Sequence, residues 1–212
     1  MSDGVRSTGP VEPMIAGPST HWHTVRLEPG LCFLGARLRP GYAPLVLSFG
    51  ALTTVNRVNR GTDAVALLPK MDELCRPAQS FCQLAQRLLE FVTSRCTRPS
   101  AIAPPRLRGA VVALQDSGGL LDLGSIADHH SVDGRTIRRD FRAGVGLAPK
   151  DYSKILQFQT ALRLMRREGL CAAAAAMEAG YTDQSHMTRR FRELGGFTPA
   201  GAKEVPLLGL PL

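Results

Sequence analysis

Two segments of this 212-residue chain, about 50 residues apart, repeat one short pattern, and this repeat constrains the fold more than any other feature. In each segment an apolar residue is followed four positions later by phenylalanine: Ile137 by Phe141, and Met187 by Phe191. Residues four apart lie on the same face of an α-helix, so each pair marks the buried face of a short helix. Arginine occupies the opposite side of both segments. The repeat predicts a mainly α-helical domain that carries two basic amphipathic helices.

The first segment has the sequence features of a helix that follows a tight turn. Ile126 and Ala127 begin a short helix, and Asp133 is a suitable N-cap for the next one. A helix with an apolar face backed by guanidinium groups is suited to enter the major groove, where arginine binds guanine edges or phosphates. The DNA-facing candidates of this segment are Arg135, Thr136, Arg138, Arg139 and Arg142.

The second segment repeats this layout. Gly180 follows Ala176 by four residues and is able to end a helix in the left-handed conformation, and Asp183 is the next candidate N-cap. The first turn of the helix after such a cap is where helix-turn-helix proteins usually contact base edges. The DNA-facing candidates of this segment are Gln184, Ser185, His186 and Arg189.

A third helix is predicted between the two, from Asp151 to about Arg167. Seventeen helical residues span about 25 Å. A rod of that length is able to hold two reading helices near the ~34 Å repeat of successive major grooves. The sequence therefore predicts a double-stranded DNA-binding transcription regulator that reads two adjacent major grooves.

At these residues the chain resembles a known family. Gly124–Ala202 is similar to the C-terminal domain of the AraC/XylS family of bacterial transcription regulators, in which one helix joins two helix-turn-helix motifs. The segments that carry the resemblance are Ser125–Asp128, Thr136–Arg142, Val145–Lys150, Ala176–His186 and Phe191–Pro199.

The resemblance implies roles for individual residues. Arg135, Arg138 and Arg139 take the DNA-facing positions of the first recognition helix, and Gln184, Ser185, His186 and Arg189 take those of the second. Three positions depart from the family pattern. Gln157 stands where the linker helix usually has arginine, Ser131 replaces the usual turn glycine, and Met187 replaces an aromatic residue.

The rest of the chain is predicted to divide into four parts. Residues 1–20 are expected to form a flexible leader, 21–98 a partial β-rich sensor-like region that ends in an amphipathic helix, 99–105 a linker, and 206–212 a tail, with the DNA-binding domain at 106–205. Short apolar runs suggest the strands Thr24–Leu27, Leu31–Leu38, Leu45–Phe49 and Ala64–Leu68. Apolar residues at helical spacing predict a helix over 78–95. Leu34–Tyr42 resembles the closing part of the β-rich sensor domain of one AraC-like subgroup, and this resemblance implies a shortened, sensor-like α+β region.

Composition limits the possible partners and settings. The formal net charge of +8 and the pI of about 9.8 favour a polyanion partner, although the two halves of the chain carry equal net charge. No apolar run approaches the ~20 residues of a membrane span and no signal peptide is visible, which predicts a cytoplasmic protein without membrane contact. Five irregularly spaced cysteines indicate a reducing compartment. No nucleophile–base pair, phosphate loop or metal-ligand motif is visible, so the chain is predicted to be no enzyme and to need no cofactor.

Two other functions stay open at this point. One is a protein-interaction module with residual DNA affinity, and the other is a metal- or redox-responsive DNA-binding sensor that uses the N-terminal cysteines. Cys75, Cys82, Cys96 and Cys171 are expected to be buried apolar residues, and His21–His23 an ordinary surface segment. RNA polymerase and a small-molecule effector are conceivable further partners, and the sequence does not distinguish a monomer from a homodimer.

Overall fold

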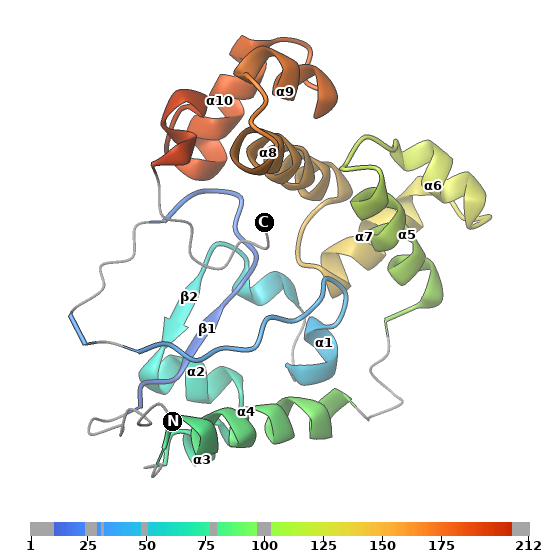
Figure 1. Ribbon diagram of the computed structural model, residues 1–212. Coiled ribbons are helices and arrows are strands. Elements are labelled where there is room, and N and C mark those ends of the chain that lie inside the picture. Colours follow the sequence, from blue (N-terminus) through green and yellow to red (C-terminus); the bar gives the residue numbers. More distant parts are fainter. Residues whose placement is uncertain are drawn as a thin grey trace. The chain divides into compact units, whose positions relative to one another are not determined.

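The computed structural model describes residues 11–23, 29–30, 32–47, 51–76, 80–96 and 103–204 (Figure 1). The chain divides into two compact units, one mainly N-terminal and one mainly C-terminal, with the change at residues 104–105. Two short segments group with the opposite unit: 142–146 with the N-terminal one and 19–23 with the C-terminal one.

The N-terminal unit combines a small two-stranded sheet with several short helices and one longer helix. Its elements are β1 (Met14–Ala16), α1 (Ala43–Val46), the 3-10 helix η1 (Ala51–Thr54), β2 (Val58–Arg60), α2 (Gly61–Leu67), α3 (Met71–Leu74) and α4 (Phe81–Cys96). β1 and β2 pair antiparallel, with Ile15 opposite Asn59. Ile15 packs with Leu47, Ala64 and Leu68 in a small buried cluster.

Most of the strands expected in this unit do not form. Residues 32–39 have no regular secondary structure, residues 45–46 belong to α1, and Ala64–Leu67 to α2, while residues 24–28 lie outside the described part of the chain. Short apolar runs fit a strand and a buried helical turn equally well, because periodicity alone does not distinguish the two. The leader expected at 1–20 contains β1, whose Ile15 is 8% exposed.

The helix predicted over 78–95 is confirmed as α4, which begins at Phe81, while residues 78–79 lie outside the described part of the chain. The burial predicted for the cysteines is wrong. Cys82 and Cys96 are exposed because they lie on α4, which has no fully buried residue, and Cys171 is exposed at the N-cap of α9. Burial, with a smaller contribution from the Asp72 carboxylate, raises the pKa of the half-buried Cys75 thiol. Within the described ranges no group of three or more His, Cys, Asp or Glu side chains is placed to hold a metal ion.

The C-terminal unit is helical, which confirms the predicted fold class. It contains α5 (Pro105–Asp116), α6 (Leu123–His129), α7 (Gly134–Gly144), α8 (Pro149–Arg167), α9 (Ala172–Glu178), α10 (Gln184–Gly195) and the 3-10 helix η3 (Pro199–Lys203). α8 begins two residues before its predicted start, because Pro149 occupies the first helical turn, where its missing N–H leaves no bond unmade. Among the described helices none has the length and apolar character to cross a membrane.

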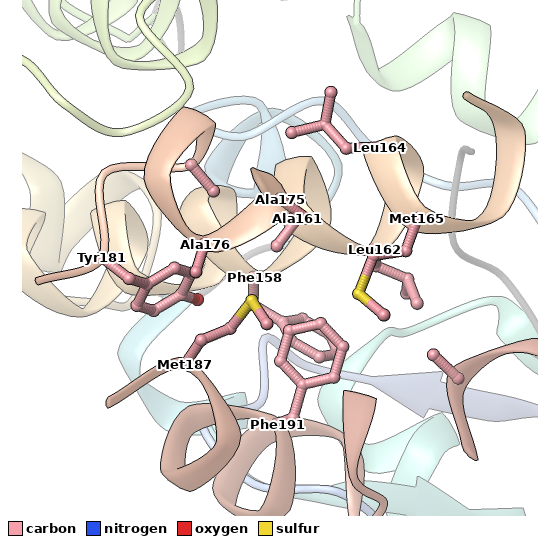
Figure 2. Close-up of a cluster of buried hydrophobic side chains, with 12 residues drawn as sticks. Phe158, Ala161, Leu162, Leu164, Met165, Ala175, Ala176, Tyr181, Met187 and Phe191 are labelled. Carbon is pink, nitrogen blue, oxygen red and sulfur yellow. The ribbon is translucent and has the colours of Figure 1, made fainter. Parts of the chain in front are cut away.

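α8 contributes side chains to the packing of both pairs of short helices. Near its N-terminal end Tyr152 packs against Phe141 of α7, with the ring centroids 5.9 Å apart. Farther along, Phe158 packs edge-on against Phe191 of α10 at 4.8 Å, in a buried cluster that includes Met187 and Ala176 (Figure 2). The aromatic pairs therefore attach α7 and α10 to different turns of one 19-residue helix.

Candidate nucleic-acid interface

α6 ends in a turn that two backbone hydrogen bonds close. The N–H of Ser131 donates to the carbonyl of Asp128 (3.0 Å), and the N–H of Val132 donates to that of Ala127 (3.1 Å). These are the two bonds of a Schellman motif, which needs a left-handed residue, and Ser131 has a φ of +53°. The Asp133 carboxylate then caps α7 by accepting from the Thr136 N–H at 2.6 Å, as predicted.

α9 ends in the same way. The N–H of Gly180 donates to the carbonyl of Met177 (3.0 Å), and the N–H of Tyr181 donates to that of Ala176 (2.9 Å). Gly180 is left-handed, with a φ of +73°, which confirms its predicted role. Asp183 caps α10 by accepting from the His186 N–H at 2.7 Å, and the connection is one residue longer than the one before α7.

Ionisable groups at these turns have shifted pKa values. The hydrogen bonds that the Asp133 carboxylate accepts from Thr136 lower its pKa. Those from Ser125 likewise lower the pKa of Asp122, which caps α6. Burial raises the pKa of Tyr181, whose hydroxyl oxygen is buried and has no hydrogen-bond partner. The Asp122 and Asp133 carboxylates therefore stay ionised to a lower pH than an ordinary aspartate does.

α7 separates its apolar and basic residues in the predicted way. Ile137 and Phe141 are both 0% exposed. The candidates Arg135, Arg138, Arg139 and Arg142 are exposed, and Thr136 is half-buried. The Arg138 guanidinium lies near Gly134, in the first turn of its own helix, and lines a hollow of about 350 Å³ together with Leu123 and Lys150.

α10 shows the same separation with a less basic outer face. Met187 and Phe191 are 0% exposed, while the candidates Gln184, Ser185 and Arg189 are exposed. His186 is half-buried, and its ring lies edge-on to Tyr181 at 5.3 Å. His186 is therefore held against the turn, whereas its neighbours Gln184 and Ser185 extend into solvent.

Residues 126–204, which run from α6 through η3, match a family model described as a helix-turn-helix domain. They form an AraC-type helix-turn-helix domain. A domain of this type makes the chain a DNA-binding transcription regulator. The match begins within α6, and the N-terminal unit has no assigned family.

Solved structures similar to this chain include three DNA-binding or regulator domains. The C-terminal domain of AraT, a response regulator from Geobacillus stearothermophilus, is 20% identical, with a TM-score of 0.46, over 52% of this chain and 93% of that one. An AraC-type regulator from Chromobacterium violaceum is 22% identical, with a TM-score of 0.45, over 47% and 90%. The DNA-binding domain of AdpA, solved with a target DNA, is 24% identical, with a TM-score of 0.44, over 48% and 92%. A comparison with curated protein sequences gives no match.

The AraC-type domain of this chain has an acidic residue on α7 that the sequence reasoning missed. Asp140 is 8% exposed, and its Oδ2 accepts from Nε of Arg106 in α5 at 2.5 Å. Its Oδ1 lies 3.8 Å from Nε of Arg139. The one available signal was an acid among four arginines, at the position where α10 has Arg190.

Proposed function

We propose that this regulator binds a specific double-stranded DNA sequence by placing α7 and α10 in two successive major grooves. One observation carries the proposal. Both helices bury an apolar pair completely and expose the opposite side, and both pack on the same helix, α8. α8 has 19 residues and so spans about 28 Å, which suits the ~34 Å spacing of successive major grooves on one face of DNA.

The two helices are proposed to divide the reading between them. On α7 the candidates are mainly cationic, which suits guanine recognition and phosphate contact. On α10 the exposed Gln184 and Arg189 are suited to adenine and guanine edges, respectively. The full proposed set is Arg135, Thr136, Arg138, Arg139, Arg142, Gln184, Ser185, His186 and Arg189.

Selection of bound sequences from a random DNA pool tests the two-groove arrangement. The expected product is a bipartite site whose two halves lie about 10 base pairs apart. The affinity for that site is expected to fall steeply with salt, with a slope of about −0.9 in log–log form for each phosphate contact. A single short motif, or no enrichment at all, would overturn the proposal.

Arg139→Ala tests base reading by α7. The substitution is expected to weaken binding to the selected site by about 1–3 kcal/mol and to relax the preference at one base pair. Fluorescence anisotropy on the selected site and on single-base variants of it measures both effects. Arg108→Ala is the matched control, because Arg108 is an exposed arginine of α5 in the same unit and is expected to leave base preference unchanged. An Arg139→Ala protein with unaltered affinity and preference would exclude this role.

A further inference from the structure

Asp140 is the one charged side chain that is buried among the residues the structure describes, and it lies on a helix that otherwise exposes arginine. A buried carboxylate is costly unless a cation and hydrogen bonds compensate it. Arg106 supplies both at 2.5 Å, from a different helix of the same unit. The pair therefore links α5 to α7 next to the proposed reading face.

The second oxygen of the same carboxylate lies near Arg139. Consecutive residues of a helix do not normally face each other, so the 3.8 Å separation means that the Arg139 side chain leans towards Asp140. The Arg139 side chain nevertheless stays 72% exposed, and its guanidinium is available to DNA. One carboxylate is thus shared between a close guanidinium in α5 and a more distant one on the reading face.

The second motif lacks this arrangement. Aligning Ile137–Phe141 with Met187–Phe191 places Arg190 where α7 has Asp140, and Arg190 bonds to Glu193 on its own helix at 2.5 Å. Arg189, the counterpart of Arg139, has no ion pair with any described residue. The acid is therefore a feature of the first reading helix and not a general requirement of the domain.

We propose that Asp140 is a positioning residue that orients Arg139 for base reading, while Arg106 holds the carboxylate in place and keeps it from capturing Arg139. This inference rests on the proposed function of α7. A free arginine side chain loses much rotamer freedom when it binds a base edge, and a weak tether that directs it beforehand reduces that loss. A full ion pair between Asp140 and Arg139 would instead compete with the base.

The test compares discrimination rather than affinity alone. Anisotropy titrations of the full chain measure the affinity ratio between the selected site and the same site changed at the base pair whose preference Arg139→Ala relaxes. The variants are Asp140→Asn, Arg106→Gln and their combination. Arg108→Gln is the control, because it removes an exposed arginine from the same helix, α5. Thermal melting of each variant reports on folding.

Asp140→Asn is expected to lower the affinity ratio between the selected and the changed site by roughly tenfold, which is a part of what one bidentate arginine–guanine contact supplies. Its affinity for unrelated DNA is expected to stay unchanged or to rise, because a negative charge is lost. Arg106→Gln is expected to lower the ratio as well, because the released carboxylate then binds Arg139. The double variant is expected to match Asp140→Asn, because Arg106 acts only through the carboxylate.

Each other outcome overturns the inference. Equal weakening on all sequences, together with a lower melting temperature, assigns Asp140 a purely structural role, and equal strengthening on all sequences assigns it a purely electrostatic one. If Asp140→Asn does not fold, Arg106→Gln decides alone, since its side chain is 37% exposed and an unchanged ratio contradicts the proposal. A wild-type protein without sequence preference refutes the proposed function itself, whereas a selective wild type with an equally selective Asp140→Asn refutes this inference only.

Discussion

At the scale of single residues, the Asp133 cap of α7 is expected to make the stability of the domain sensitive to acid. The Asp133 carboxylate accepts the Thr136 N–H, and this bond lowers its pKa below the ordinary value. Because the unfolded chain then takes up the proton at a higher pH than the folded domain, the stabilisation is complete above the unfolded pKa and is lost as the pH falls through the folded one. We therefore expect the free energy of unfolding of the wild type to decrease as the pH drops below about 4.

Asp133→Asn isolates this contribution. Asparagine is a good N-cap without a titrating group, so the variant is expected to lose less stability than the wild type between pH 6 and pH 3. Urea unfolding at both values, followed by circular dichroism, gives the difference. Parallel loss in the two proteins would show that the cap does not contribute to the pH dependence.

How far single residues are predictable depends on whether their partners are local. The caps Asp133 and Asp183 were predictable because the group that each satisfies lies three residues on. The burial of Phe158 follows from the helical spacing that it shares with Leu162 and Met165, but its contact with Phe191 does not. The pairing of Asp140 with Arg106 is not predictable either, because both partners lie more than 30 positions away, where no periodic pattern indicates them.

At the scale of elements, the turn of the second motif packs against the turn that follows α5. A Cβ atom built on Gly180 would lie 2.1 Å from Cδ2 of Leu120 and 3.4 Å from Nε2 of Gln157. Gly180 is also left-handed, which costs any other L-residue about 1–2 kcal/mol. Gly180→Ala is therefore expected to lower the free energy of unfolding mainly by this backbone cost, with a smaller addition of less than about 1 kcal/mol for the overlap, because the exposed Leu120 side chain is able to move.

Gly169 provides the matched control for this substitution. It is left-handed too, with a φ of +72°, but a Cβ there would meet no atom within 4 Å. Gly169→Ala should show the backbone cost alone, and Leu120→Ala should remove the excess cost of Gly180→Ala when the two are combined. Denaturant titrations of the wild type, the three single variants and the double variant measure these costs, and equal costs for the two glycines would exclude a contact between the turns.

Elements were predictable where a helical period runs over several turns. α4 and α8 appear near their predicted bounds because their apolar spacing recurs over several turns, and α7 and α10 begin directly after their predicted N-caps. β1 and β2 have three residues each and pair across more than 40 positions, so neither length nor alternation marks them. The N-terminal unit was therefore predicted less well than the C-terminal one.

At the scale of the whole molecule, the chain's single tryptophan belongs to the unit that its position in the sequence does not suggest. Trp22 lies in the segment that groups with the C-terminal unit, and its indole packs on Gly196, the left-handed C-cap of α10. Its fluorescence should therefore report the unfolding of the DNA-binding unit, whereas far-ultraviolet circular dichroism reports both units.

Destabilising each unit separately tests this assignment. Gly180→Ala is expected to move the urea midpoint detected by Trp22 fluorescence. Leu68→Ala, which removes a 4%-exposed side chain from the core of the N-terminal unit, is expected to cost that unit about 2–5 kcal/mol and to leave the fluorescence midpoint in place while part of the dichroism transition moves. Two compact units with separate cores unfold independently unless their contacts are strong. If Leu68→Ala also shifts the urea midpoint detected by Trp22 fluorescence, the two units unfold as one cooperative body instead.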